Sequence, residues 1–235
     1  MLKERFGRTI ALLGRDKAEA VSRASVMVIG CGAVGGYALE MVARLGFGKI
    51  WAVDFDVFEE SNINRQILAV TETLGKKKCD VAKERVLAIN PEAEVMAVDL
   101  RVSADNLGFI LQAKPDFVID AIDEMNAKAA LISFLVKNGI WFVSAMGAAL
   151  KTRPELLAPA RLDKTSGCPM AKKLREMLRR DSVDLKKVRC VFSPEAVCPT
   201  KDEEGRNILG SLPMVPAGMG GMLAAEVLKE CLQRA

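Results

Sequence analysis

The chain has 235 residues, half of them apolar and 27% charged, which is the composition of a globular protein with a sizeable core. It contains no histidine, and this excludes the commonest general base and the usual serine and cysteine triads. The net charge is only +4, but residues 151–189 hold twelve Lys or Arg against five Asp or Glu. Such a local excess indicates an anionic partner, although a solvated helix face gives the same pattern.

The expected elements alternate along the first 145 residues. Strands are expected at 25–30, 49–54, 94–100, 116–123 and 140–145, and helices at 16–24, 33–45, 76–89, 104–113 and 126–138. Asp16 and Glu19 have capping-box spacing for the first helix, Gly46 ends the second, and Asn90 with its following proline ends the third. This alternation predicts an α/β, Rossmann-like, doubly wound fold with a mainly parallel sheet.

The alternation loosens after residue 150. We expect a basic helix at 169–180, a strand at 188–192 and a closing helix at 217–233. The chain is therefore predicted to be a single domain over residues 1–235. Its parts would be an N-terminal arm and helix (1–24), a nucleotide-binding core (25–150) and a C-terminal, substrate-binding extension on the same sheet (151–235).

Residues 208–225 carry no charge but include two prolines and four glycines. Because a membrane-spanning helix needs about 20 apolar residues, we expect a buried strand, a turn and a helix start there instead. The charged start of the chain shows no apolar signal run, and the six cysteines form no C-x-x-C pair. These patterns predict reduced thiols, no zinc site and a cytoplasmic location.

A glycine motif follows the first expected strand, with Gly30, Gly32 and Gly35 in the spacing G-x-G-x-x-G. Small residues there let the backbone approach a phosphate at a helix N-terminus, but the motif alone fits NAD, FAD and ATP sites. Asp54 ends the second expected strand, where its carboxylate can accept both ribose hydroxyls.

Two cations narrow the choice of nucleotide. Arg65, in the polar loop 55–75, and Lys78 favour a triphosphate beside the glycine motif. Asp123, at the end of the fourth expected strand, can hold Mg²⁺. This set suits attack by a carboxylate on the α-phosphate, because cations would stabilise the developing charge. An ionised carboxylate needs no general base, in agreement with the absence of histidine.

The ordered motifs "GCGAVGG", "DFD", "SNINRQ", "LGKKK" and "DAID" resemble those of the ATP-dependent activating enzymes related to the bacterial ancestors of ubiquitin E1. The resemblance implies that Asp54 and Asp56 contact ATP, the former at the ribose. It implies that Asn62, Arg65 and Lys78 face the phosphates and that Asp123 faces magnesium. It also implies a homodimer, in which Arg8 of "RFGRTIALLG" reaches the ATP of the partner chain.

Within that family, sulfur-carrier activators usually contain two C-x-x-C zinc pairs, which this chain lacks. The segments "DKTSGCPMAKKLREMLRR", "VRCVFSPEA" and "GSLPMVPAGMGGMLAAEVLKE" instead resemble the branch of tRNA threonylcarbamoyladenosine dehydratases. The branch implies that ATP adenylylates the threonyl carboxylate of threonylcarbamoyladenosine beside the anticodon, and that ring closure releases AMP. Lys172, Arg175 and Arg179 recur at helical spacing in the basic stretch and are the expected tRNA contacts.

Three alternatives stay open at this stage. They are an adenylyltransferase for the C-terminal glycine of a ubiquitin-like sulfur carrier, an NAD-dependent oxidoreductase, and a non-catalytic nucleotide-binding adaptor. Cys168, in a Gly-Cys-Pro turn, is either an acyl acceptor or a small apolar residue before a helix. A cysteine desulfurase or other sulfur-acceptor system is a further partner to consider.

Overall fold

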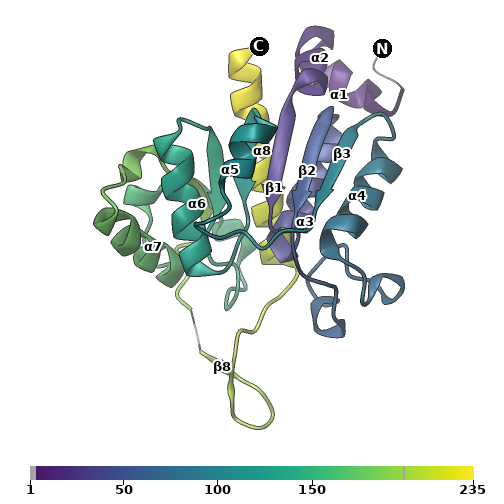
Figure 1. The fold of residues 1–235 in the computed structure, drawn as a ribbon. Coiled ribbons are helices and arrows are strands. Elements are labelled where there is room, and N and C mark those ends of the chain that lie inside the picture. The colour runs from purple at the N-terminus through teal and green to yellow at the C-terminus, as the bar shows by residue number, and fades with distance from the viewer. Residues whose placement is uncertain (1–3, 198) are drawn as a thin grey trace.

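A computed structural model describes residues 4–197 and 199–235. Its centre is a seven-stranded sheet with the order β3-β2-β1-β4-β5-β7-β6, parallel except for the pairing of β6 with β7 (Figure 1). The strands are β1 Ser25–Ile29, β2 Lys49–Val53, β3 Glu94–Val98, β4 Phe117–Asp120, β5 Phe142–Ala145, β6 Ala158–Arg161 and β7 Arg189–Phe192. The two short strands β8 Thr200–Lys201 and β9 Asn207–Ile208 form a separate hairpin.

Helices cover both faces of the sheet. They are α1 Gly7–Leu13, α2 Arg15–Arg23, α3 Ala33–Leu45, α4 Lys78–Ile89, α5 Gly108–Ala113, α6 Met125–Lys137, α7 Pro169–Arg180 and α8 Met214–Arg234. Short 3₁₀ helices lie at Glu4–Phe6, Glu60–Asn62, Thr71–Thr73, Pro154–Leu156, Leu162–Lys164 and Leu185–Lys187. The predicted α/β, doubly wound fold is confirmed.

Alternating side chains of the central strands build two apolar clusters. Val26 and Val28 of β1 pack with α3, α4 and α8, whereas Met27 and Ile29 pack with α5, α6 and α7. All of these residues are buried, because a parallel strand between two helix layers has no face toward water. The continuous apolar run that predicted β1 therefore reflects burial on both faces.

Two local predictions were wrong, and one strand was missed. The first main helix begins at Arg15 after Gly14, and no side chain caps it, so Asp16 lies inside the first turn rather than at the N-cap. No buried strand occurs at 208, since Ile208 belongs to the short strand β9 and is 51% exposed, and Leu209 after it is 73% exposed. Strand β6 was not predicted, because it is an edge strand of only four residues that includes Pro159.

The two ends of the sheet carry different segments (Figure 1). Helices α1 and α2 lie at one end, where Phe6 packs against Gly46 and Arg5 donates to the carbonyl of Ile89 at 2.7 Å. The β8–β9 hairpin projects from the other end, where the parallel strands β1, β2 and β4 finish. In doubly wound sheets, ligands bind at this second end.

Two further findings concern the described part of the chain. None of its helices is long and apolar enough to cross a membrane. The five cysteines at 31, 79, 168, 190 and 231 are free and buried, whereas Cys198 lies outside the described residues.

Candidate active site

The glycine loop joins β1 to α3, and its three glycines have different surroundings. Gly30 has a φ of +94°, and a Cβ on it would lie 2.7 Å from the carbonyl oxygen of Ala121. A Cβ on Gly35 would overlap the carbonyl oxygen of Gly30. A Cβ on Gly32, at the N-cap of α3, would meet nothing closer than the side chain of Gln66 at 3.9 Å. The outer two glycines therefore serve close backbone packing, and Gly32 leaves open the approach to the helix N-terminus.

Asp54 braces this loop from the end of β2. Its Oδ2 accepts the backbone N–H of Cys31 at 2.6 Å, and its Oδ1 accepts that of Asp56 at 2.8 Å. Burial raises the pKa of the Asp54 carboxyl, while the two backbone hydrogen bonds oppose that shift. Each carboxylate oxygen has a second lone pair, so the geometry leaves acceptors for ribose hydroxyls.

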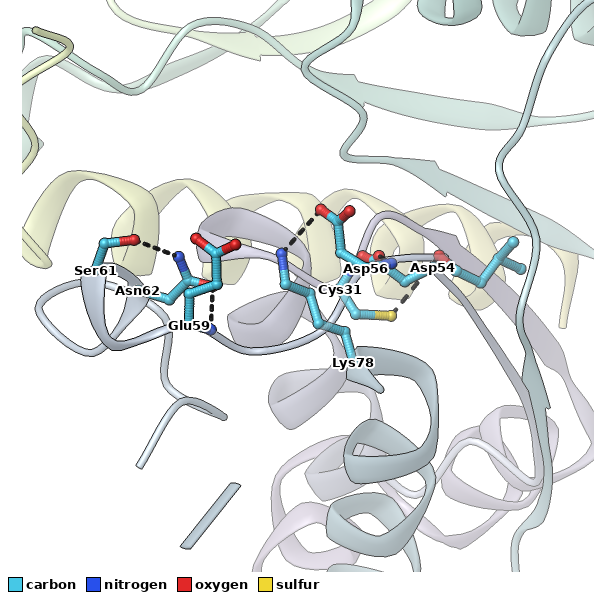
Figure 2. Close-up of polar contacts among 8 residues, drawn as sticks. Cys31, Asp54, Asp56, Glu59, Ser61, Asn62 and Lys78 are labelled. Carbon is cyan, nitrogen blue, oxygen red and sulfur yellow. Dashed lines mark hydrogen bonds and ion pairs between the residues drawn. The ribbon is translucent and has the colours of Figure 1, made fainter. Parts of the chain in front are cut away.

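Lys78 is the first residue of α4 and is buried. Figure 2 shows its amine turned toward the carboxylate of Asp56, and Nζ lies 3.2 Å from Oδ2. The backbone N–H of Lys78 also donates to the carbonyl of Asp56 at 2.9 Å. Three of the predicted ATP contacts therefore lie together at the C-terminal end of β2. They are Asp54, Asp56 and Lys78.

The polar loop folds over the same end of the sheet. Asn62 is buried, and its Oδ1 accepts the backbone N–H of Glu59 at 3.3 Å (Figure 2). Arg65 is half-buried, and its Nη1 donates to the carbonyl of Ser61 at 2.7 Å and to Oδ1 of Asn64 at 2.9 Å. The remaining guanidinium donors of Arg65 have no hydrogen bond within the part of the chain that the structure describes.

Asp123 lies in the loop between β4 and α6, and its side chain is exposed. The described residues contain no group of three or more His, Cys, Asp or Glu side chains that would hold a metal ion by themselves. A single exposed carboxylate at this edge still fits Mg²⁺, because that ion is commonly held by one or two carboxylates together with phosphate oxygens.

Comparison with known proteins decides the family. A profile of the ThiF family matches residues 6–235. The chain belongs to the ThiF family. This confirms the resemblance seen in the sequence.

Three bacterial relatives at 34–36% identity are tRNA threonylcarbamoyladenosine dehydratases. The chain is 36% identical to the tRNA threonylcarbamoyladenosine dehydratase of Escherichia coli strain K12, over 99% of this chain and 95% of that protein. A solved structure of the E. coli enzyme with ATP has a TM-score of 0.91 and covers 98% of this chain and 95% of that one. The sulfur carrier protein adenylyltransferase of Thermus thermophilus is 30% identical, over 97% of this chain and 78% of that protein.

The basic helix of this ThiF-family chain differs in detail from the prediction. Lys172 and Arg179 are exposed on α7, as expected. Arg175 is half-buried, and its Nη1 donates to both the carbonyl (3.1 Å) and the hydroxyl of Thr165. Arg175 therefore ties α7 to the preceding segment. Lys173 and Arg180, which were not singled out, are exposed with Lys172 and Arg179.

Helix α7 packs beside α6, close to the candidate site. The backbone N–H groups of Asn126 and Ala127 hold the pKa of Glu124 below its ordinary value, and the charges of Arg101 and Lys173 lower it further. Lys173 thus lies near the residue that follows Asp123. The spacing of charges along a helix cannot reveal this proximity, which depends on how α7 docks on α6.

Arg8 lies far from the glycine loop of its own chain. It is exposed on α1, at the end of the sheet where β2 begins. The two ends of the sheet are roughly 16 Å apart, because a strand such as β2 has five residues and each residue adds about 3.3 Å. The structure therefore does not bring Arg8 to the other predicted site residues of the same ThiF-family chain.

Four buried polar side chains near the site have no role predicted from the sequence. Lys128 and Ser144 are fully buried together with Asp120 of the "DAID" motif. The signal for Lys128 was present, because it lies at helical spacing with the apolar Leu131, Ile132 and Leu135. Gln66, from the "SNINRQ" motif, is buried beside Gly32, and its Oε1 has no partner among the described residues.

Proposed function

We propose that this protein is an ATP-dependent tRNA threonylcarbamoyladenosine dehydratase. It activates the threonyl carboxylate of N6-threonylcarbamoyladenosine by adenylylation and closes it to the cyclic, dehydrated form. One observation carries the proposal. The glycine loop, Asp54 and Lys78 lie together where β1 and β2 end, in a chain that matches the E. coli enzyme of this name over nearly its whole length.

The first step forms a bond between a carboxylate oxygen of the substrate and the α-phosphorus of ATP. The bond between the α- and β-phosphates breaks, and pyrophosphate leaves. Asp54 holds the ribose, and the N-terminus of α3 at Gly32 favours the phosphate charge. Arg65 and Lys78, with Asn62 beside them, stabilise the negative charge that develops during transfer. Asp56 contributes by holding Lys78 at the site before the nucleotide binds.

In the second step, a nucleophile of the same modification attacks the activated carbonyl carbon and loses its proton. The bond to AMP breaks, so that the net change in the nucleoside is the loss of one water. Asp123 would hold Mg²⁺, which spreads charge over the phosphate oxygens when bound. Because the chain supplies no histidine, the proton of this nucleophile passes to the departing AMP phosphate or to solvent. Only the first step needs no proton acceptor, because its carboxylate nucleophile is already ionised.

The tRNA is proposed to bind across α7. The exposed cations Lys172 and Arg179 lie on this helix, and Lys173 extends the positive charge toward Glu124 at the edge of the site. Phosphates of the anticodon stem would displace counterions from these side chains. A tRNA substrate also implies a cytoplasmic location for this ligase-type enzyme.

The active form is proposed to be a homodimer in which Arg8 completes the site of the partner chain. Support comes from the position of Arg8 on α1, at the end of the sheet away from its own glycine loop. The proposed partners also include a cysteine desulfurase or other sulfur-acceptor system. Cys168 is not the acceptor in this proposal, because it is 4% exposed within an apolar cluster before α7.

The deciding experiment supplies ATP, Mg²⁺ and tRNA that already carries threonylcarbamoyladenosine. We expect AMP and pyrophosphate to form in step with a nucleoside lighter by one water, detected by mass spectrometry. The matched control is the same tRNA without the modification, which should release no AMP. Adenylylation of a ubiquitin-like carrier with the tRNA left unchanged would instead establish the sulfur-carrier activity.

A binding measurement addresses the oxidoreductase alternative. Because a ligand that binds only the folded state stabilises it, ATP with Mg²⁺ should raise the melting temperature, and NAD should not. Stabilisation by NAD alone would contradict the proposed function.

A further inference from the structure

A fully buried polar triad lies where β4 and β5 end. Asp120, Lys128 and Ser144 each have 0% exposure. Nζ of Lys128 lies 2.8 Å from Oδ2 of Asp120, and the Ser144 hydroxyl donates to the same oxygen at 2.6 Å. The three residues come from β4, α6 and β5, so the triad joins three elements below the candidate site.

Two residues of the triad also form hydrogen bonds with the backbone of Ile122, one with its N–H and one with its carbonyl. Oδ1 of Asp120 accepts the Ile122 N–H at 3.1 Å, and Nζ of Lys128 donates to the Ile122 carbonyl at 2.9 Å. That carbonyl belongs to the peptide unit that leads into Asp123. The ion pair therefore fixes two successive peptide planes immediately before the predicted magnesium ligand.

The residue after Asp123 is anchored as well. Glu124 caps α6 by accepting the backbone N–H groups of Asn126 at 2.9 Å and Ala127 at 2.6 Å. The Asp123 side chain is exposed, while its neighbours on both sides are hydrogen-bonded. Such an arrangement presents one carboxylate from a backbone with little freedom to move.

The same segment abuts the glycine loop. The N–H of Ala121 donates to the carbonyl of Ile29 at 2.8 Å, and a Cβ on Gly30 would lie 2.7 Å from the Ala121 oxygen. These two contacts therefore fix the segment that leads to Asp123 relative to the loop that would hold the phosphates. A shift of the Ile122 peptide would change the separation of carboxylate and phosphate.

Stability alone explains this triad poorly. Removing two charges from water costs more than their attraction commonly returns, and well-packed apolar residues often replace a buried ion pair without loss of stability. What apolar residues would not reproduce is the pair of hydrogen bonds to the Ile122 backbone.

We infer that Lys128 and Asp120 are positioning residues, which hold the Ile122–Asp123 peptide so that the Asp123 carboxylate meets Mg²⁺ on the ATP phosphates. The inference rests on the proposed function, because it takes Asp123 as the magnesium ligand. Neither Lys128 nor Asp120 touches the nucleotide in this account. Their effect passes through the orientation of Asp123.

The test uses the double variant Asp120→Asn/Lys128→Met in the full chain. Asparagine keeps an acceptor for the Ile122 N–H and can donate to Ser144, while methionine removes the donor to the Ile122 carbonyl. The variant therefore breaks one hydrogen bond to the loop without leaving a buried charge. Lys137→Met, an exposed lysine on the same helix, is the matched control.

Calorimetric binding of ATP, with and without Mg²⁺, is the main measurement. Because groups that orient a metal ligand typically change metal affinity by about ten- to hundredfold, we expect the Mg²⁺ enhancement of ATP binding to fall by at least that lower factor. Binding of ATP without Mg²⁺ should stay near that of the parent protein, and Lys137→Met should change neither. A folded double variant with parental Mg²⁺ enhancement would overturn the inference.

Asp123→Asn separates this inference from the proposed function. If Asp123→Asn lowers the Mg²⁺ enhancement and the double variant does not, only the positioning role is lost. If Asp123→Asn leaves the enhancement unchanged, the magnesium assignment and the positioning role both fail.

A measurement on the unmodified protein covers the case in which the double variant does not fold. The Ile122 amide should exchange its hydrogen as slowly as the amides of β4. Exchange as fast as in the exposed hairpin 200–208 would show that the hydrogen bonds of the triad do not hold this peptide, and would overturn the inference.

Discussion

Nζ of Lys78 lies 3.2 Å from Oδ2 of Asp56, and the N–H of the same lysine donates to the carbonyl of Asp56 at 2.9 Å. These two contacts join the first turn of α4 to the loop that follows β2. The side chain of Lys78 is buried, so its position is set before any ligand arrives. A cation held in this way loses little conformational freedom when a phosphate binds.

Replacement of Lys78 tests this arrangement. Lys78→Met should lower turnover by about a hundredfold, the usual effect of removing one preorganised donor from a developing charge. The neighbouring Lys77 is exposed and pairs with Asp99 at 2.6 Å, which makes Lys77→Met a matched control. Because exposed ion pairs contribute little, the control should retain parental turnover in steady-state assays of AMP formation. Equal losses in both variants would show that the charge of the α4 terminus matters rather than the position of Lys78.

Arg65 offers a test that separates binding from chemistry. If its free donors act mainly on the transition state, Arg65→Ala should lower turnover by about a hundredfold or more and change ATP affinity far less. Turnover at saturating ATP and the equilibrium dissociation constant for ATP provide the two readouts. Near-parental turnover would make Arg65 a structural residue of the loop, where it already bonds Ser61 and Asn64.

Glu40 gives a prediction about pH and stability. This buried carboxyl of α3 accepts hydrogen bonds from Arg85 of α4 at 2.7 Å and from Arg44 at 2.8 Å. Burial raises its pKa, but the hydrogen bonds of the two arginines outweigh burial and leave the pKa below its ordinary value. Because the folded pKa is the lower one, the carboxylate stabilises the fold above the unfolded pKa, and this contribution is lost as pH falls through the folded pKa.

Glu40→Gln should therefore cost about 1–3 kcal/mol of unfolding free energy at neutral pH, since hydrogen bonds to a charged group are lost. The difference from the parent should shrink from about pH 5 downward. Urea unfolding at several pH values measures both quantities. Glu19→Gln, which alters an exposed pair with Arg23, is the control and should show no such pH dependence.

The basic face of α7 is testable through salt dependence. Lys172→Ala/Arg179→Ala should weaken tRNA binding and flatten the slope of log affinity against log salt by about 1.4 to 1.8, at about 0.7 to 0.9 per phosphate contact. Arg175→Met should instead lower stability by about 1–3 kcal/mol, because it removes a charged donor from Thr165. An unchanged slope in the double variant would show that this face does not bind tRNA.

Arg8 predicts complementation between inactive chains. Arg8→Ala mixed with Asp123→Ala should recover activity, since the Arg8→Ala chain keeps Asp123 and receives an intact Arg8 from its partner. Arg65→Ala mixed with Asp123→Ala should not recover, because both residues belong to the same chain's site in our proposal. Mixed dimers verified by mass spectrometry that never regain activity would contradict the shared site.

Several features were determined by the sequence alone. Helices α3 and α7 have the predicted bounds, because Gly46 adopts the left-handed conformation after α3 and Pro169 occupies the first turn of α7. The central parallel strands β1, β2, β4 and β5 were visible as apolar runs, since both of their faces are buried. The glycine loop and Asp54 were predicted at the strand ends, where this fold places its ligands.

Other features were decided only by the tertiary structure. From the charge spacing on α7, Arg175 and Lys172 were both expected to contact tRNA. In the folded protein, the guanidinium of Arg175 instead donates to Thr165. Asp120, Lys128 and Ser144 meet from three separate elements, and no local pattern records which buried polar groups will face one another. Periodicity and capping act over a few residues and can be read along the chain. Long-range hydrogen bonds depend on how the chain returns through space, so they exist only once the helices have packed on the sheet.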